Sequence, residues 1–568
     1  MRGYLAASIA VTCAAALAFP LALSTDAAAA PPAAGSPTTE RATPDRPASD
    51  RTARARPETP STSKTSAETA TSAGTAAEAP VAAPAAPAAP VTAVSAGSAT
   101  DRSIPGSTQS LPLAPLTPPP GDRTLPPTSA PASTPAATQG LPRRDVRRFS
   151  LVGVVWDNPD MELQGRVQVR TRASGTAKWS VWQDVDTHNR EHAADPDTAE
   201  RTSGRVRGST APLWVGDSDG VEVRVQAESD GRPEADGRAV AGDLLPRGLR
   251  IELIDPGVDP AAEPPPQASG VDTPRGNVLS PEAAASSAVN ADLAPLGATS
   301  IPALSQKQTE SDLVATRGDS AGVVSGTDKP APKDKPVVKE KPGTTGKTGT
   351  IGNADAASAG EGQRVKPYIG ARPRIVTRRG WGADETLRER NFSYTKTVKA
   401  AFVHHTASGI NYRCAQAPSV IRSIYRYHVK SSGWRDIGYN FLIDKCGNIY
   451  EGRAGGVAKP VMGAHTLGFN TNSMGIAVLG SFGASNPPAA AVKAIAKLTA
   501  WKLGLFGANP KGKTYLKSGG GNLYRKGKNV RLNVISGHRD GFATECPGGR
   551  LYAKLGTARA TSARYQGR

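Results

Sequence analysis

The chain has 568 residues and a formal net charge of +19, from 69 Lys and Arg against 50 Asp and Glu. Only 5% of the residues are aromatic, and neither residues 31–148 nor residues 215–367 contain a Phe, Trp or Tyr. Such stretches bury too little apolar surface to offset the entropy of ordering them, which excludes a chain folded throughout. All seven Trp lie in two blocks, 156–214 and 381–501, where we expect two folded domains.

The positive charge is concentrated toward the C-terminus. Residues 368–568 hold 32 Lys and Arg against 8 Asp and Glu, a net charge of +24, whereas the rest of the chain is slightly acidic. A basic surface concentrates polyanions such as nucleic acid, anionic lipid or an anionic wall polymer. The compartment of the protein decides among these partners.

The N-terminus is typical of a secretory signal peptide. Arg2 supplies a positive charge, residues 5–23 are almost wholly apolar, and residues 27–30 are small, as at a cleavage site. The alternative is an uncleaved anchor, because the apolar run approaches the length of a membrane span. We predict a signal peptide over residues 1–30, a secreted or cell-wall-associated protein without stable membrane insertion, and no nucleic-acid partner.

Three cysteines remain once Cys13 is removed with the signal: Cys414, Cys446 and Cys546. An odd number of cysteines in an exported protein needs an explanation, because a free exposed thiol is reactive. One disulfide together with one metal-bound or catalytic cysteine would account for all three.

Low-complexity sequence surrounds the first predicted domain. Residues 31–148 are rich in Ala, Pro, Thr and Ser, and residues 256–367 are rich in Pro and then in Lys. Both stretches are predicted to be disordered linkers. Residues 557–568 are predicted to be a basic tail.

Residues 149–255 are predicted to form a small all-β domain. Apolar and polar residues alternate over residues 167–172, 221–225 and 249–253, as in half-buried strands. Turn residues separate these segments, so a β-sandwich-like accessory domain is expected.

Two pairs of side chains in this domain allow a functional or a structural interpretation. Trp179 and Trp182 are compatible with a carbohydrate-binding surface, but we favour packing within the sheet. His188 and His192 are four residues apart in a charged loop, and we do not expect them to bind a metal.

Residues 368–556 have the composition of an ordinary α/β domain. Apolar runs that indicate strands alternate with segments of helical periodicity. Strands are expected at 400–403, 439–444, 448–451, 474–482 and 533–536, helices at 418–430 and 487–505, and a loop at 507–530.

Three side chains of this domain are candidate metal ligands. His404 and His538 each follow a predicted strand, and Cys546 lies eight residues after His538. Two His and one Cys give zinc three protein ligands and leave a position for water, as in catalytic zinc sites. The structural alternative is a buried Cys546 and a core or capping His538. Pairing of Cys414 with Cys446 would leave Cys546 as the unpaired thiol, which favours the metal site.

Seven sequence blocks resemble the peptidoglycan recognition protein family, whose enzymatic members are zinc N-acetylmuramoyl-L-alanine amidases of the type-2 amidase fold. The resemblance covers residues 374–556, about a third of the chain. The blocks are RGWG (379–382), FVHHTA (402–407), GWRDIGYNF (433–441), IYEGR (449–453), GAHT (463–466), SMGI (473–476), and SGHRD (536–540) with TECPG (544–548). The resemblance implies a mixed β-sheet with flanking helices.

The resemblance also implies a set of catalytic residues. The zinc ligands of the family match His404, His538 and Cys546, and His404 is preferred to His405 because it directly follows the Phe-Val strand. The catalytic tyrosine matches Tyr439. Phage relatives carry a lysine where this chain has Thr544, so Thr544 is expected to be a second hydrogen-bond donor and any lysine-dependent mechanism is in doubt.

Four further residues are implied to contact the substrate: Trp434, Arg453, His465 and Asn470. In the family, the matching Gly-Trp pair and Arg accompany diaminopimelate-type stem peptides, and a guanidinium can bind the extra carboxylate bidentately. Plain core packing is the alternative for Trp434. Ala454 departs from the Gly that usually follows the Arg, which would reshape the groove wall.

The resemblance therefore predicts a secreted zinc amidase that hydrolyses the amide between N-acetylmuramic acid and L-alanine in peptidoglycan. Zinc lowers the pKa of a bound water to about 7, which provides a nucleophile at neutral pH. Peptidoglycan is the expected partner, together with anionic wall polymers that match the basic domain. The alternative is a peptidoglycan-binding module without activity. Non-cleaving members lack the zinc cysteine, whereas this chain keeps Cys546.

Overall fold

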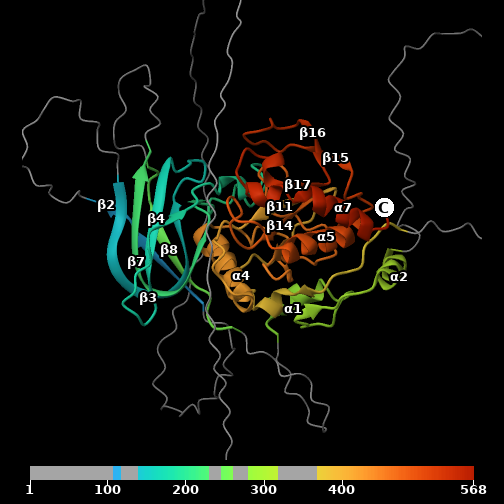
Figure 1. Ribbon diagram of the computed structural model, residues 1–568, viewed down its shortest axis with the longest axis horizontal. Helices are drawn as coiled ribbons and strands as arrows, with labels where there is room; N and C mark the ends of the chain where they lie inside the picture. Colours follow the sequence, from blue (N-terminus) through green and yellow to red (C-terminus); the bar gives the residue numbers. More distant parts are fainter. Residues whose placement is uncertain (1–105, 117–137, 229–244, 260–278, 318–366) are drawn as a thin grey trace, which may run out of the picture. The chain divides into compact units, whose positions relative to one another are not determined.

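The fold is that of a computed structural model, which describes residues 106–116, 138–228, 245–259, 279–317 and 367–568 (Figure 1). The predicted signal peptide, residues 1–30, lies outside the described residues. All of the described residues belong to one compact unit, residues 97–568. Among them, no helix combines the length and the apolar character that a membrane span requires.

The alternating segments of the first domain form an antiparallel sheet, which confirms the predicted all-β domain. Its strands are β1 (Ser107–Pro112), β2 (Ala114–Pro115), β3 (Thr138–Trp156), β4 (Gly165–Ala173), β5 (Gln183–Val185), β6 (Gly208–Ser209), β7 (Leu213–Ala227) and β8 (Arg250–Asp255). The strand order is β1-β8-β3-β7-β4-β5, and β2 and β6 pair with β3. Register shifts between β3 and β7 bend these two long strands, so one hydrogen-bonded sheet encloses the core.

The domain is longer than predicted, because β1, β2 and half of β3 lie within the predicted linker 31–148. Six main-chain pairings join β1 to β8 although β1 contains only one large apolar residue, Leu111. Pairing of this kind depends on main-chain hydrogen bonds, so the amino-acid composition of the segment does not predict it. Figure 1 draws β2, β3 and β7 in the same sheet, as their pairings require.

The two tryptophans that had two interpretations pack against arginines on this sheet. The Arg170 guanidinium lies 5.9 Å from the Trp179 ring centre and 4.9 Å from that of Trp182. Arg224 lies 4.2 Å from the Trp182 ring. These cation–π contacts agree with the favoured packing role.

The second domain is built on a mixed seven-stranded sheet, as predicted. Its strands are β9 (Ser300–Ile301), β10 (Ile375–Val376), β11 (Ala400–His405), β12 (Phe441–Ile443), β13 (Ile449–Glu451), β14 (Ser473–Val478) and β17 (Ile535–Gly537). The order is β17-β11-β14-β12-β13-β10-β9. β11 runs parallel to both β14 and β17, whereas β12 and β13 form an antiparallel hairpin.

Helices cover this sheet on both faces. The helices of this domain are α1 (Pro281–Ala288), α2 (Gln306–Arg317), α3 (Arg378–Trp381), α4 (Ala417–Arg426), α5 (Ala489–Gly504), α6 (Gly549–Tyr552) and α7 (Leu555–Tyr565). Short helical turns are η3 (Cys414–Gln416), η4 (Tyr427–Ser431) and η5 (His538–Asp540) in this domain, and η1 (Arg190–His192) in the β domain. α5 and α7 lie side by side and share a core with Val403 and Ile476 of the sheet (Figure 1). α4 packs with Leu442 and Ala477 in a separate apolar cluster.

Three stretches predicted to lack regular structure are ordered parts of this domain. In the predicted linker 256–367, α1, β9 and α2 are present, and Ile301 pairs with Ile375. In the predicted tail 557–568, most residues belong to α7. In the predicted loop 507–530, β15 (Lys513–Lys517) is present and pairs with β16 (Asn529–Asn533), whose first two residues also lie in the predicted loop. Each predicted linker or loop contributes a few large apolar side chains to a core, such as Ile301, Leu313 and Leu516, but they are too widely spaced to give a periodic pattern.

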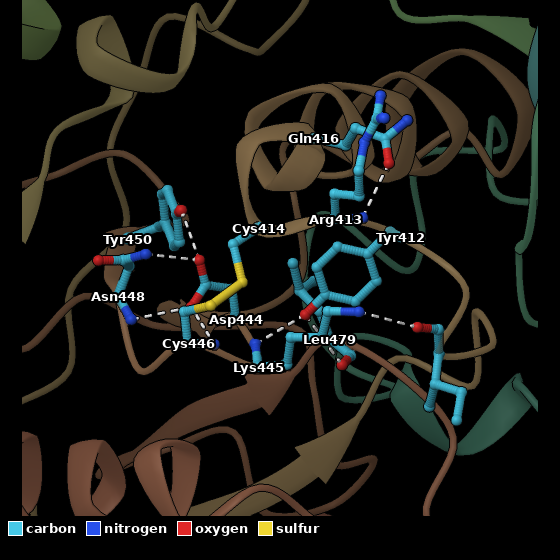
Figure 2. Close-up of a disulfide and its surroundings, with 11 residues drawn as sticks. Tyr412, Arg413, Cys414, Gln416, Asp444, Lys445, Cys446, Asn448, Tyr450 and Leu479 are labelled. Atoms are coloured by element: carbon cyan, nitrogen blue, oxygen red, sulfur yellow. Dashed lines mark hydrogen bonds between the residues drawn. A yellow bond between two sulfur atoms is a disulfide. The ribbon is translucent and has the colours of Figure 1, made fainter. Parts of the chain in front are cut away.

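A disulfide between Cys414 and Cys446 ties the start of α4 to the β12–β13 turn (Figure 2). The Asp444 carboxylate organises this turn, because it accepts hydrogen bonds from the main-chain N–H groups of Cys446 and Asn448, at 2.9 Å each, and from the Tyr450 hydroxyl, also at 2.9 Å. The turn of the β12–β13 hairpin, which follows Tyr439 in the chain, is therefore fixed by the disulfide and by Asp444.

The two domains share an apolar core. Leu151, Val155, Trp214 and Ile254 of the β domain lie in the same buried cluster as the apolar residues of α4. The buried Tyr427 hydroxyl donates to the carbonyl oxygens of Thr210 and Val154, at 3.1 and 3.3 Å. The β domain is thus attached to the α4 side of the second domain by packing typical of a protein interior.

Candidate metal centre and substrate groove

Two histidines end neighbouring parallel strands. Val403 of β11 lies opposite Gly537 of β17, so the next residue of each strand, His404 and His538, stand side by side with ring centroids 4.5 Å apart. Both histidines are fully buried. The parallel pairing of β11 and β17 is therefore what places two imidazoles at one edge of the sheet.

Cys546 joins these histidines from the loop that follows η5. Its sulfur lies 3.8 Å from Nδ1 of His404, and its main-chain N–H donates to Oγ1 of Thr544 at 3.1 Å. The neighbouring His405 accepts a hydrogen bond at 3.4 Å from the main-chain N–H of Phe482 and lies outside the cluster. The structure thus brings His404, rather than His405, together with Cys546.

A fourth side chain, His192, reaches the same point from the β domain. One ligand atom from each of His192, His404, His538 and Cys546 lies within 4.8 Å of the others. The His192 ring centroid is 4.5 Å from that of His538 and 5.4 Å from that of His404. His192, which was not expected to bind a metal, therefore lies among the candidate ligands, because η1 buries it in this cluster, whereas His188 lies outside it.

The nitrogen atoms of this cluster fit a metal ion. Nδ1 of His538 and both ring nitrogens of His192 are buried and have no hydrogen-bond partner among the described residues. Leaving such groups unsatisfied costs about 1–3 kcal/mol each. A metal ion would satisfy them, and a set of imidazole nitrogens with one thiolate is typical of zinc. The cluster is therefore a candidate zinc site.

The remaining ring nitrogens are held by second partners, which orient the histidines. Nε2 of His404 lies 3.3 Å from Nδ1 of His465. Nε2 of His538 lies 3.2 Å from the main-chain oxygen of Glu191, a residue of the β domain. Such outer contacts fix the ring orientation of metal-binding histidines.

Burial sets the protonation of these groups. It lowers the pKa of His404 and of His538 well below the usual value, so both are neutral imidazoles, the form that binds metal. It raises the pKa of the Cys546 thiol well above its usual value. A thiolate at this position therefore needs a compensating positive charge, which a bound cation supplies.

Tyr439 and Thr544 lie beside the cluster. The Tyr439 ring centroid is 5.6 Å from that of His404, and burial raises the tyrosine pKa well above its usual value, so the hydroxyl stays protonated. Thr544 donates its hydroxyl to Oε1 of Glu191 at 2.8 Å. Both residues predicted to be donors thus carry a hydroxyl proton next to the candidate metal site.

Trp434 and Arg453 are buried close to the Tyr439 turn. The Trp434 ring stacks on that of His428, with centroids 4.3 Å apart, and His428 Nδ1 accepts a hydrogen bond from Gly438 N at 3.3 Å. Nε of Arg453 donates to the carbonyl oxygen of Ile437 at 3.0 Å. This anchoring leaves the two terminal nitrogens of Arg453 to face a carboxylate.

His465 and Asn470 occupy one turn behind the cluster. Oδ1 of Asn470 accepts hydrogen bonds from the main-chain N–H groups of His465 and Thr466, at 2.7 and 3.0 Å. His465 is fully buried and contacts His404. The structure therefore places His465 behind His404, a candidate metal ligand, while Asn470 directs its amide nitrogen toward the β domain.

The β5–β6 segment, residues 186–207, covers these residues with three acidic side chains. Both Glu200 oxygens accept from Arg453, at 2.9 and 2.8 Å. Asp195 accepts from the Asn470 amide at 2.7 Å, and Glu191 accepts from Thr544. The sequence gives no sign of these acids, because a charged loop has no pattern that identifies partners more than 200 residues away.

A cavity of about 140 Å³ remains between the segment and the cluster. Glu191 and His192 line one side, and Tyr439, Thr544 and Cys546 line the other. Ligand-binding pockets usually measure about 300–1,000 Å³. The space next to the candidate metal site is thus too small for a sugar–peptide unit while the segment is in place.

Comparisons with known proteins agree with this architecture. The family described as N-acetylmuramoyl-L-alanine amidase matches residues 394–549, and the one described as Rv3811 N-terminal galactose-binding domain-like matches residues 99–242. Peptidoglycan-recognition protein SC2 of Drosophila simulans is 31% identical over 185 residues, which are 32% of this chain and 85% of the relative. The human N-acetylmuramoyl-L-alanine amidase is 29% identical over 212 residues, 36% of this chain and 31% of the relative.

A solved structure of peptidoglycan recognition protein-LE in complex with tracheal cytotoxin, a monomeric diaminopimelic acid-type peptidoglycan, is also similar. It is 31% identical, covers 32% of this chain and 92% of its own, and has a TM-score of 0.26. The match is confined to one part of this chain.

Proposed function

Because the chain belongs to the peptidoglycan-recognition protein family, we propose that it is a zinc-dependent N-acetylmuramoyl-L-alanine amidase, which hydrolyses the amide between N-acetylmuramic acid and L-alanine in peptidoglycan. The observation that carries the proposal is the buried cluster of His404, His538 and Cys546, in which His538 Nδ1 has no hydrogen-bond partner among the described residues. A protein that only recognised peptidoglycan would have no use for this donor set.

The residues of the chain divide the chemistry among them. His404, His538 and Cys546 would hold zinc, which supplies a polarising charge and a bound water of lowered pKa. Tyr439 stays protonated at neutral pH, so its hydroxyl is suited to donate to the oxygen that becomes negative during hydrolysis. Thr544, whose hydroxyl oxygen accepts a hydrogen bond from the main-chain N–H of Cys546, would be a second donor.

Arg453 gives the substrate class. The two terminal nitrogens of its guanidinium each donate a hydrogen bond to the Glu200 carboxylate. A guanidinium that can bind a carboxylate through two parallel hydrogen bonds is selective for planar carboxylate groups. We therefore propose stem peptides of the diaminopimelate type, whose extra carboxylate Arg453 would bind. His465 and Asn470 then act by positioning His404 and the adjoining turn.

Export belongs to the same proposal. A cell-wall substrate requires a protein outside the membrane, which the apolar N-terminus with its small-residue cleavage site would provide. The net charge of +24 over residues 368–568 suits anionic wall polymers as a second partner. N-terminal sequencing of the protein recovered from its native wall tests both points.

The decisive experiment combines metal content with product identity. The full chain and its Cys546→Ala variant are purified, zinc per chain is measured, and both are incubated with diaminopimelate-type peptidoglycan. We expect one zinc per chain and peptides that begin at L-alanine from the wild type alone. Tyr439→Phe should keep the zinc and lower the rate about 100-fold, the cost of one lost donor.

The opposite result would assign a recognition function. In that result, the wild-type chain and the His192→Ala chain both bind zinc and peptidoglycan, and neither releases any peptide.

A further inference from the structure

The β5–β6 segment occupies the site from the metal cluster to the far end of the groove. As its residue numbers increase, its contacts move away from the metal cluster and along the groove. Glu191 and His192 meet the cluster, Asp195 meets Asn470, and Glu200 meets Arg453. The segment therefore lies along the same row of side chains that the proposed substrate requires, so the two cannot bind together.

The contacts of the segment imitate those of a peptide ligand. The main-chain oxygen of Glu191 accepts a hydrogen bond at 2.8 Å from the N–H of Leu467, and that of Ala193 accepts from the Asn470 amide at 3.1 Å. Ala193 packs with Leu467 and Phe542 in a small apolar cluster. Main-chain pairing with one small side chain in an apolar pocket is how an extended peptide is commonly held.

Glu200 stands where the proposed substrate would place a carboxylate. The side chains of Glu200 and Arg453 are only 5% and 6% exposed, and the Arg435 main-chain N–H donates to the same carboxylate at 3.1 Å. The neighbouring guanidinium holds the Glu200 pKa below its usual value despite burial, so the carboxylate is ionised. A buried, ionised and fully paired acid satisfies Arg453 as completely as a ligand carboxylate would.

His192 adds a fourth donor to the candidate metal site. Neither of its ring nitrogens has a partner among the described residues, although the ring is fully enclosed by His404, His538 and Tyr439. Three protein ligands leave zinc a position for water, whereas four close the coordination shell. An unpartnered imidazole at this place is therefore suited to fill the position that catalysis needs.

We infer that His192 is the fourth protein ligand of the metal centre and that the β5–β6 segment is a built-in inhibitor which occupies the groove in place of a diaminopimelate-type peptide. The inference rests on the proposed function. The described state is then latent, and the wild-type chain releases peptide only from the fraction of molecules in which residues 186–207 have left the groove.

The rest of the β domain need not move for the segment to leave. The sheet is held to α4 by the shared apolar core of Leu151, Val155, Trp214 and Ile254, which lies outside the segment. The segment itself contains no strand and only the three residues of η1 as a helical turn. Its attachment is mostly polar, so local displacement is compatible with a domain that stays in place.

Cobalt spectroscopy tests the ligand assignment without reference to catalysis. Zinc in the full chain is replaced by Co²⁺, and acetohydroxamate is added as a probe for an open coordination position. We expect no change in the visible spectrum of the wild type and a saturable change in His192→Ala. His188→Ala, which removes the neighbouring histidine outside the cluster, should behave as the wild type. Zinc affinity, measured by chelator competition, should fall about tenfold or more in His192→Ala alone.

Peptide release tests the inhibitor. The zinc-loaded His192→Ala and Glu200→Gln chains should each release L-alanine-terminated peptides at least about tenfold faster than the wild type. Glu228→Gln, at an exposed position of the same domain, should leave the rate unchanged. Glu200→Gln keeps the size of the side chain and lies away from the cluster, so it serves even where His192→Ala does not fold.

The outcomes separate the two proposals. A wild-type cobalt spectrum that responds to acetohydroxamate as His192→Ala does would overturn the ligand assignment, and equal rates for all chains would overturn the inhibitor. Absence of peptide release from every chain, with the cobalt spectra differing as expected, would overturn the amidase function and keep His192 as a ligand.

Discussion

The Glu200 carboxylate accepts two hydrogen bonds from the Arg453 guanidinium, at 2.9 and 2.8 Å, across 253 residues of sequence. It joins a loop of the β domain to the turn that follows β13. Because both side chains are buried, this ion pair is exposed to little solvent screening.

Removal of one partner of this pair should be costly. We expect Glu200→Ala to lower the free energy of unfolding by about 3 kcal/mol, because Arg453 is left charged and buried. The double variant Glu200→Ala with Arg453→Ala should recover part of the loss. Urea denaturation of the four chains of this cycle measures the coupling. Additive losses in the double variant would show that the two side chains do not interact.

Metal removal should destabilise the chain. Zinc bound at a thousand times its dissociation constant adds about 4 kcal/mol to the folded state. We therefore expect a chelator to lower the melting temperature of the wild type by several degrees and to leave Cys546→Ala unaffected. Calorimetry with and without chelator makes the comparison, and an equal response in the two chains would remove Cys546 from the metal site.

The attachment of the two domains depends on a missing side chain at Gly153. A Cβ added there would lie 2.4 Å from the Tyr427 ring. We expect Gly153→Ala to cost about 1–3 kcal/mol through overpacking. Gly483→Ala is the matched control, because no atom lies within 4 Å of its added Cβ. Guanidinium denaturation compares them, and equal midpoints would show that the interface adapts without loss.

One histidine of the β5–β6 segment should make stability depend on pH. The Asp186 carboxylate raises the pKa of His188 to about 9. A pKa raised on folding gives stability that is complete below about 6.5 and lost as the pH rises through about 9. His188 is largely exposed, so the effect should stay below about 1 kcal/mol.

Melting temperatures of the wild type and of His188→Gln from pH 6 to pH 10 test this dependence. The advantage of the wild type should be present at the acid end and disappear at the alkaline end. An Asp186→Asn chain should show the same loss of dependence, and a difference constant over the whole range would exclude the ion pair as its cause.

The catalytic half of the candidate site was accessible from the sequence because its residues stand at strand ends. His404 and His538 follow apolar runs that were predicted as strands, and the parallel register then places them together. Cys546 was a candidate as the cysteine left unpaired, and the resemblance supplied Tyr439 and Arg453, since each lies in a block with a fixed motif. Local patterns of this kind can be predicted from the sequence because they depend only on neighbouring residues.

The other half of the site was not accessible, for a physical reason. His192 and Glu200 lie in a segment with neither periodicity nor a motif, and their partners are far along the chain. The helix α1 and strand β9 were likewise hidden in a Pro- and Lys-rich stretch. Asn290, just after α1, is held by a hydrogen bond to Glu451 at 2.9 Å, and composition cannot reveal such a contact.

The β5–β6 segment comes before the cluster residues in the sequence, which affects when each is synthesised. Residues 186–207 precede His404, His538 and Cys546, so a ribosome completes the segment before it completes the cluster. An inhibitor carried on the same polypeptide is also present at one copy per site, at an effective concentration that dilution does not lower. If the segment inhibits the proposed activity, no second protein is needed to keep the chain latent, and the event that starts activity must act on the molecule itself.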